Sequence, residues 1–585
     1  MRYKADTITM QVIRYALEEV ADEMGYTLVR TSRSTIIKEI MDISCAVFDR
    51  EGRTVAQAHH APMLLTAFEI AMKEVAARFP PERLRDGDLI ACNDPYLGGQ
   101  HLMDVQLFAP VFLRNELIGW VAALAHQQDM GGAAPGGVAG GMTEIFMEGL
   151  RLPMVKLYKA GKEDPELFGL IASNIRIPDK TLADIRAQAS ACFVGARRLK
   201  EIAVKYGVDV LSTCTAMLLD YSEARIRQAL REFPDGALSG EDWIDNDGIT
   251  DQPIKVQVNI EKRRDEVVVD FDGTSGQVRG NINRPVATTY AAVYYGLIAI
   301  ADPRCPANSG CYRPITIRTR PGLIVDPRPP SAVAARTNTS QKIVEATMKA
   351  FAGVVPDRVM AGSHGQISTL AFSGFHLRTG KRFVYTDIQG GGAGGLAGKD
   401  PRDGQDSHLA RFMNTPIEAA ELEYPIRIER YEFLPDSGGP GRWRGALGLR
   451  RDVRCLADGM VLARYADRQE FAPFGLLGGK DGTPGRLLLN PDTERTTRLK
   501  AKGMDVLARD DVVSMRQPGG GGYGPPRERD PDRVAQDVRD DKVSAEAAVR
   551  DYRVVVDPVT YKVDRQATAA LRGCAGRGET WAPTP

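Results

Sequence analysis

The stretch NDPYLGGQHLMDVQLFAPVFLRNELIGWVAALAHQQDMGG (93–132) decides how the N-terminal part of this chain folds. Within it, two apolar runs, 105–113 and 117–125, flank the polar turn Arg114-Asn115-Glu116. Apolar runs of strand length on both sides of a short polar turn are typical of a β-hairpin. The stretch therefore predicts two antiparallel strands, with histidines and acids gathered at the open end.

The register of this hairpin brings an acid and a histidine together. If the hairpin is centred on Asn115, Asp104 lies opposite His126, and directly opposed side chains are about 5 Å apart at Cβ. Pro110 in the first strand indicates an edge or a bulge, because proline donates no hydrogen bond to a neighbouring strand. A slip of one residue would put Asp104 and His126 on opposite faces, so the prediction depends on the register.

A metal site follows from this pairing. His101 lies three residues before Asp104, after a Gly98-Gly99 loop that allows the chain to fold back toward the hairpin. Two imidazoles and one carboxylate leave coordination positions open, which is typical of a catalytic rather than a structural site. These ligands suit Zn, Mn or Fe equally. The alternative is that His101 and His126 are hydrogen-bonded structural residues.

Two further acids are candidates near this site. Asp42 begins an earlier hairpin and, by the same counting, falls opposite His59 or His60, which makes it a candidate fourth ligand. Asp129 is a candidate catalytic residue that orients His126 or relays protons. An equally good interpretation is that Asp129 caps the turn before Gly131-Gly132.

The pattern outside the hairpin predicts an α+β fold with several domains. A helix is expected from Asp6 or Thr7 onward, with an apolar face of Ile8, Val12, Ile13, Leu17 and Val20. The predicted parts are a metal-bearing α+β domain (1–235), a mixed α/β domain (236–415), a β-rich domain (416–524) and a helical C-terminal segment with a tail (525–585). The glycine-rich run 390–398 is expected to be a mobile or ligand-facing loop.

Composition limits the possible partners and compartments. Lys plus Arg and Asp plus Glu both number 76, so the basic excess of a nucleic-acid binder is absent. Eight scattered cysteines predict reduced thiols, and no apolar stretch is long enough to span a bilayer. We therefore expect a cytoplasmic protein that binds neither nucleic acid nor membrane. No GxxxxGK[ST] phosphate loop is present in the sequence.

Long motifs in order along the chain resemble one family. They include EIMDISCAVFD (39–49), NDPYLGGQHLMDV (93–105), AHQQDMGG (125–132), EGLRLPMVKLY (148–158), SQKIVEA (340–346), RYEFLPDSGGPGRWRGALGL (430–449) and QPGGGGYGPPRERDP (517–531). With these motifs the chain is identified as a member of the hydantoinase B/oxoprolinase family, which is related to acetone and acetophenone carboxylase subunits. The resemblance implies a metal site of His101, Asp104 and His126, with Asp42 as a further ligand. Family members often read AHHAD where this chain has AHQQD, so Gln127 replaces a second histidine.

The resemblance also implies a division of labour between two subunits. An A-type ATP-binding partner would phosphorylate the amide oxygen of a small cyclic amide, and this chain would complete ring opening at a divalent metal ion within a hetero-oligomer. The alternatives are a subunit of an ATP-dependent ketone carboxylase, a non-haem iron oxygenase and a scaffold subunit with a structural metal. Arg313 and His408 lie in or near family-like segments, where they either contact substrate or partner or form ordinary salt bridges and core packing.

Overall fold

The predicted hairpin is the centre of a seven-stranded antiparallel sheet. The computed structural model describes residues 5–58, 60, 67–406 and 408–573 of the chain. The strands of this first sheet are β1 (Ile43–Phe48), β2 (Thr54–Gln57), β3 (Leu89–Cys92), β4 (Asp104–Leu113), β5 (Glu116–His126), β6 (Val155–Lys159) and β7 (Lys162–Glu163), in the spatial order β2-β1-β5-β4-β3-β6-β7. β4 and β5 thus lie inside the sheet, with β1 beside β5.

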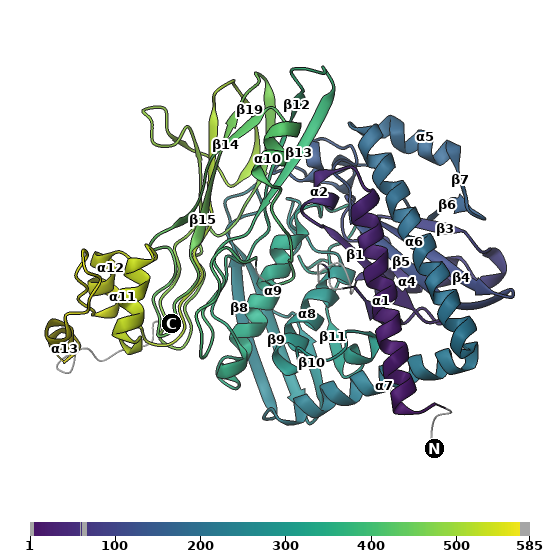
Figure 1. Cartoon of the computed structure of the whole chain (residues 1–585), viewed down its shortest axis with the longest axis horizontal. Coiled ribbons are helices and arrows are strands. Elements are labelled where there is room, and N and C mark those ends of the chain that lie inside the picture. The colour runs from purple at the N-terminus through teal and green to yellow at the C-terminus, as the bar shows by residue number, and fades with distance from the viewer. Residues whose placement is uncertain (1–4, 59, 61–66, 407, 574–585) are drawn as a thin grey trace.

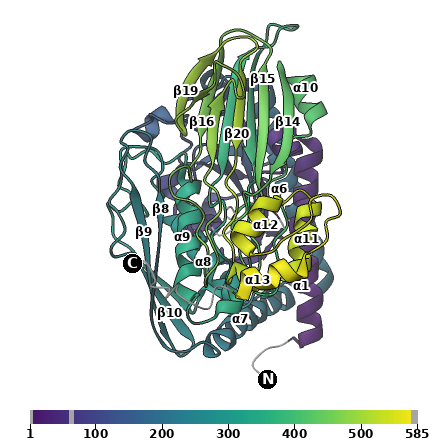
Figure 2. The ribbon, with the colours of Figure 1, turned by 90° about the vertical axis from the view of Figure 1, so that its left-hand side faces the viewer.

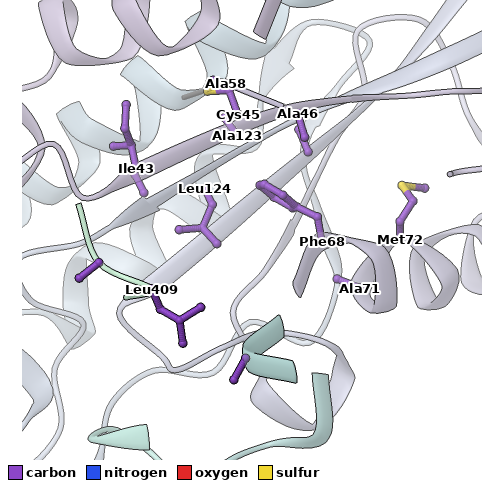
Figure 3. Packing of buried hydrophobic residues seen from close by; sticks show 14 of the residues in the cluster. Ile43, Cys45, Ala46, Ala58, Phe68, Ala71, Met72, Ala123, Leu124 and Leu409 are labelled. Atoms are coloured by element: carbon purple, nitrogen blue, oxygen red, sulfur yellow. The ribbon is translucent and has the colours of Figure 1, made fainter. Parts of the chain in front are cut away.

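Helices cover both faces of the first sheet. The helices of this part are α1 (Thr7–Thr31), α2 (Thr35–Lys38), α4 (Ala67–Arg78), α5 (Pro165–Asn174), α6 (Pro178–Tyr206) and α7 (Val208–Arg231). On one face Phe68 of α4 contacts Phe48 and Phe108 edge-on, with ring centroids 6.0 and 5.9 Å apart, and Figure 3 shows Phe68 against the strands. On the other face the Gln188 amide of α6 donates to the Val105 carbonyl oxygen at 2.8 Å.

The first helix forms as predicted, but its buried face differs from the prediction. Asp6 caps α1 by accepting a hydrogen bond from the Thr9 amide at 2.8 Å. Ile8 and Val12 are 79% and 46% exposed, so the predicted apolar face is wrong at these two positions. The face is rotated because α1 packs closely on α6, where a Cβ on Gly195 would lie 2.3 Å from the Met24 sulfur. Figure 1 shows the two helices side by side in front of the sheet.

A second sheet of four strands carries two buried helices. Its strands are β8 (Gly236–Ile244), β9 (Ile254–Arg263), β10 (Glu266–Asp270) and β11 (Ile315–Arg318), in the order β11-β10-β9-β8. Its helices are α8 (Val286–Ala301) and α9 (Arg336–Phe351). The close approach of α9 to β8 requires glycine, because a Cβ on Gly240 would lie 2.1 Å from the Ala346 carbonyl oxygen. α9 is therefore held at a fixed position over the second sheet.

Two further sheets form the C-terminal half and project at the top of Figure 1. One contains β12 (Ser368–Phe375), β13 (Arg382–Gln389), β16 (Met460–Tyr465) and β19 (Lys502–Leu507), in the order β13-β12-β16-β19. The other contains β14 (Ile426–Leu434), β15 (Gly448–Cys455), β17 (Arg486–Leu489), β18 (Thr497–Arg498) and β20 (Val512–Arg516), in the order β14-β15-β20-β17-β18. Strands from both sides of the predicted boundary at 415/416 thus share one sheet, and the domain division stays a prediction.

The glycine-rich run does not form the expected mobile or ligand-facing loop. Gly391 to Gly395 are buried against other glycine-rich segments. A Cβ on Gly392 would lie 2.1 Å from the Gly520 nitrogen, and the Gly439 amide donates to the Gly520 carbonyl oxygen at 2.7 Å. Backbones pack this closely only when side chains are absent. The glycines between 391 and 395 therefore allow close backbone packing.

Short helices complete the chain. They are α10 (Ile417–Glu423), α11 (Pro531–Arg539), α12 (Ala545–Tyr552) and α13 (Arg565–Gly573), and the last three form the yellow group that faces the viewer in Figure 2. Helices combined with mainly antiparallel sheets confirm the predicted α+β class. In the described part of the chain, no single helix has both the length and the apolar composition to cross a membrane, although α6 and α7, bent by 106°, pass that test as a pair.

Candidate metal centre

Three neighbouring strands place Asp42, His126 and Asp104 in one row. Asp104 of β4 pairs with His126 of β5, as the sequence predicted. β1 lies on the other side of β5 with Ile43 opposite Ala125, and the His126 amide donates to the Asp42 carbonyl oxygen at 3.0 Å. Cross-strand neighbours point to the same face of a sheet. Asp42 therefore lies beside His126, a neighbour that was not counted from the sequence. Its predicted place opposite His59 or His60 stays a prediction, and His59 lies outside the described residues.

The pairing of Asp104 with His126 depends on two local features that compensate each other. The turn contains two residues, Arg114 and Asn115, both with positive φ (51° and 67°), as hairpin turns of this length require. Counted from this turn alone, the register would differ by one residue from the predicted register. A bulge between Val111 and Phe112, directly after Pro110, restores it.

His101 approaches the row from a loop that is held by backbone contacts. Gly98 has a φ of 91°, and a Cβ on Gly99 would lie 2.7 Å from the Asn93 backbone, so this turn requires glycine at both positions. The Asn93 side-chain amide donates to the Leu102 carbonyl oxygen at 2.7 Å. These contacts place His101 at the open end of β4 and β5.

The donor atoms of His101, Asp104 and His126 converge on one point. His101 Nε2 lies 3.1 Å from His126 Nδ1 and 3.2 Å from Asp104 Oδ1. His126 Nδ1 lies 3.2 Å from Asp104 Oδ1 and 3.6 Å from Asp42 Oδ2. Ligands about 2.1 Å from a common ion are separated by roughly 3.0–3.5 Å. The donors of His101, Asp104 and His126 therefore match the spacing of a coordination sphere, and Asp42 lies beside His126.

Hydrogen bonding fixes which nitrogen of His101 is available to an ion. His101 Nδ1 donates to the Ala334 carbonyl oxygen at 2.9 Å, and a carbonyl can only accept, so this nitrogen carries the proton. Nε2 is then the nitrogen with the free lone pair, and it is the nitrogen that faces His126 and Asp104. In metal-binding histidines, the ring nitrogen that does not bind the metal usually donates to a carbonyl or carboxylate, which fixes the orientation of the ring.

Burial and charge set the protonation states of the cluster. Burial, reinforced by Arg336, lowers the pKa of His101 to about 4, which keeps the imidazole neutral. Burial alone would raise the pKa of Asp104, but His101 and Arg336 outweigh it and hold that pKa far below its ordinary value. Burial raises the pKa of Asp42 to about 7, and the Oδ1 atom of Asp42 has no hydrogen-bond partner among the described residues. A divalent cation would favour both carboxylates in their ionised form.

Arg336 completes the centre and was not found from the sequence. It is 1% exposed, and its Nη2 donates to Asp104 Oδ2 at 2.6 Å and to Gln100 Oε1 at 2.9 Å. Asp104 thus offers one oxygen to the cluster while the other is held by a guanidinium. The preceding loop is positioned by Glu148, whose Oε1 accepts hydrogen bonds from the Val333 and Ala334 amides, both at 2.7 Å.

Comparison with known proteins identifies the family. The model of the hydantoinase B/oxoprolinase family matches residues 6–526. The chain belongs to this family. A putative B-type D-/L-hydantoinase subunit from Pseudomonas sp. (strain NS671) is 35% identical over 588 residues, covering 97% of this chain and 98% of that protein.

Solved structures agree with the assignment to the hydantoinase B/oxoprolinase family. The crystal structure of ATP-dependent caprolactamase from Pseudomonas jessenii superimposes with a TM-score of 0.91 at 31% identity, covering 97% of this chain and 100% of that chain. A nucleotide-free acetone carboxylase structure superimposes with a TM-score of 0.90 at 17% identity, covering 98% of this chain and 83% of that chain, which shows a likeness of fold alone. The chain is thus similar over nearly its whole length to enzyme subunits of this kind.

The remaining candidate residues of this family member lie outside the cluster. Asp129 accepts hydrogen bonds from the Gly131 amide and from Arg176 Nη1, both at 2.9 Å. These contacts match the turn-capping interpretation, and none of them reaches His126. Arg313 forms ion pairs with Asp220 and Glu223, both at 2.9 Å, which is the salt-bridge alternative that the sequence left open.

Proposed function

We propose that this chain is the metal-holding subunit of a two-component, ATP-dependent enzyme that opens a cyclic amide such as a hydantoin, oxoproline or lactam. The observation that carries the proposal is the convergence of His101, Asp104 and His126 donor atoms, with Asp42 beside them, at the wall of an enclosed cavity. Relatives named as a B-type hydantoinase subunit and as an ATP-dependent caprolactamase support both the reaction class and the need for a partner.

The residues of the centre are suited to a catalytic ion. A divalent ion held there would supply Lewis-acid chemistry, polarising a carbonyl group and making water more acidic. The chain contributes the neutral His101 ligand, oriented by Ala334, and the ionised Asp104, held by Arg336. Zn, Mn and Fe all accept imidazole and carboxylate ligands. Protein ligands on one side of the ion would leave positions for a reactant.

The division between two subunits follows from the chemistry of amides. An amide resists hydrolysis near neutral pH, and phosphorylation of its oxygen would convert that oxygen into part of a good leaving group. We propose that an A-type ATP-binding subunit performs this phosphorylation. Water then adds to the activated carbon in the cavity of this chain, and the ring C–N bond breaks to leave an amine and an acyl phosphate. A second water hydrolyses the acyl phosphate, which gives the carboxylate and releases inorganic phosphate.

Reconstitution of this chain with an A-type ATP-binding subunit tests the proposal. We expect phosphate release above background only when both subunits, ATP and a cyclic amide are present, with one open-chain product formed for each activated amide. Bicarbonate-dependent consumption of a ketone by the same pair would instead identify a carboxylase subunit. A pair that carries metal but turns over neither class of substrate would reject both reactions.

A further inference from the structure

The cavity has a second polar wall that faces the metal ligands. Its residues come from the third sheet, where Thr369 of β12 pairs with Ile388 of β13 on one side and with Tyr465 of β16 on the other. Thr386 precedes Ile388 by two residues on β13 and therefore lies on the same face of the sheet. All four side chains line the same cavity as His101, Asp104 and His126.

Two hydroxyl groups in this wall are buried without a hydrogen-bond partner in the part of the chain that the structure describes. Tyr465 and Thr386 are 1% and 3% exposed, and neither hydroxyl has a hydrogen-bond partner among the described residues. Buried hydroxyl groups in folded proteins are nearly always hydrogen-bonded, because an unmet donor is costly. Burial raises the pKa of Tyr465 well above its ordinary value, so its hydroxyl stays protonated and can donate. Both groups therefore face a position where a hydrogen-bond acceptor is expected.

The start of α9 faces the same cavity without a cap. α9 is 16 residues long, its N-cap residue Ala335 provides no side-chain hydrogen bond, and Ala335, Arg336 and Thr337 line the cavity. The first turn of a helix carries a partial positive charge. The Arg336 and Asn338 amides already donate to the Val333 and Ala335 carbonyl oxygens, at 3.0 and 3.2 Å, so the helix contributes this charge to the cavity. Arg336 adds Nε and Nη1, which are buried and have no partner among the described residues, while its Nη2 holds Asp104.

We propose that the N-terminus of α9, Arg336, Tyr465 and Thr386 form an oxyanion subsite that binds the phosphoryl group of the activated substrate opposite the metal ligands. Helix N-termini and guanidinium groups are the usual protein partners of phosphate, and the Arg336 guanidinium and the Tyr465 and Thr386 hydroxyl groups can all donate hydrogen bonds. The apolar side chains of Ile367, Ile388 and Phe412 line the rest of the cavity and suit the carbon ring of a cyclic amide. The assignment to a phosphoryl group rests on the proposed function.

Titration of the full-length, zinc-loaded chain with inorganic phosphate tests the subsite. We expect saturable binding by calorimetry, and affinity about tenfold lower in Tyr465→Phe and in Thr386→Val, because each variant loses one hydrogen bond to a charged ligand. Thr386→Ser keeps the hydroxyl and should retain most of the affinity. Zinc content is measured in each variant and is expected to equal that of the unmodified chain.

Matched controls separate the subsite from general effects of the substitutions. Tyr552→Phe removes a hydroxyl that is also buried and unpartnered among the described residues but lies in α12, and Thr347→Val removes a buried hydroxyl of α9 that donates to the Ile343 carbonyl oxygen. Neither variant should change phosphate affinity. Unchanged affinity in folded, zinc-loaded Tyr465→Phe and Thr386→Val would mean that phosphate binds only to the metal, and this result overturns the subsite.

The subsite and the proposed function fail in different ways. Phosphate binding needs neither the partner, ATP nor a cyclic amide, so it is measured even if the reaction has been assigned wrongly. The subsite alone is rejected if ring opening is normal but phosphate affinity is unchanged in Tyr465→Phe and Thr386→Val. Phosphate affinity that depends on both hydroxyls, without turnover of any cyclic amide, rejects the reaction alone.

Discussion

Two buried clusters of histidine and carboxylate lie along α9, and they differ in how their atoms meet. At the start of the helix, His101, His126 and Asp104 direct their donor atoms to one point. Farther along, Glu345 of α9 pairs with His408 at 3.4 Å, while His364 pairs separately with Asp406 at 3.3 Å. Among the described residues, neither His364 nor His408 belongs to a group of three ligand atoms close enough to share an ion. Residue type alone therefore does not make a metal site.

The carboxylate of Glu345 in the second cluster has several partners on one of its oxygens. Glu345 Oε1 accepts hydrogen bonds from both the amide and the hydroxyl of Ser363, and Arg468 lies close enough to influence its charge. Burial would raise the pKa of Glu345, but His408 and Arg468 outweigh it and lower this pKa to about 2. The side chains of this second cluster thus pair two by two, although Glu345 Oε2, His408 Nε2 and both ring nitrogens of His364 have no hydrogen-bond partner among the described residues. In the first cluster, one oxygen of Asp42 and several atoms of Arg336 remain without partners among the described residues.

The largest difference between the two clusters is expected in metal content when one imidazole is removed from each. His126→Ala removes the donor at the centre of the row, so we expect metal content to fall from about one ion per chain to near zero and turnover to fall to background. Elemental analysis and phosphate release with the partner measure both effects. His408→Ala deletes a similarly buried imidazole and should keep the metal, with a loss of stability of about 3 kcal/mol because Glu345 is left unpaired. Full metal content in His126→Ala would contradict the site.

Removal of a supporting arginine should have a smaller effect on the metal. Arg336→Met leaves Asp104 Oδ2 without its guanidinium partner, and we expect metal affinity to fall about 10–100-fold, as for other residues that orient a ligand. Competition with a chelator measures this change. Arg468→Met is the control, because Arg468 is also 1% exposed and makes two hydrogen bonds to Asp242. Equal metal affinity in the two variants would show that Arg336 has no special role.

The second cluster should make the stability of the protein depend on pH in the acid range. The pKa of Glu345 is lowered in the folded chain, so its contribution to stability is present above about pH 4.5 and is lost as the pH falls toward about 2. We expect Glu345→Gln to remove this part of the pH dependence, which amounts to a contribution on the order of 3 kcal/mol. Urea unfolding of both proteins between these pH values measures it. Parallel stability curves would show that the ion pair contributes nothing.

The smallest effect on chemistry is expected at Asp129. Asp129→Asn weakens the contact with Arg176, so we expect a loss of stability of about 1–2 kcal/mol, while kcat per metal-loaded chain stays unchanged. Thermal unfolding and the pH profile of kcat distinguish the two possible roles of the residue. A large fall in kcat with the metal retained would instead support Asp129 as a proton relay.

Local pattern was sufficient to predict part of the site. The apolar runs on either side of Arg114 and Asn115 identify the hairpin, and the pairing of Asp104 with His126 is observed. It is correct because the two-residue turn and the bulge after Pro110 compensate each other. The position of Asp42 beside His126 was not predicted, because strand order in space, β1 beside β5, is not encoded in the spacing within one hairpin.

Other features required contacts between distant segments. Arg336 is 232 residues from Asp104 in the sequence. A single arginine at the start of a helix does not indicate which distant acid it will contact. The glycine run 390–398 has the composition of a flexible loop, but burial against Gly520 makes it part of the packed interior. The exposure of Ile8 and Val12 depends on where α6 packs against α1, and helical periodicity does not predict that position.

By itself, the sequence determined the hairpin, the ligand types, the mixed α+β class and the family, because strand alternation, turn chemistry and long motifs are properties of neighbouring residues. Tertiary structure alone decided that three strands and the start of α9 meet at one cavity. It also decided which polar atoms lack partners there. Whether donor atoms converge depends on what is nearby in space, so only the folded chain distinguishes a cluster whose three donor atoms meet at one point from a cluster whose side chains pair two by two.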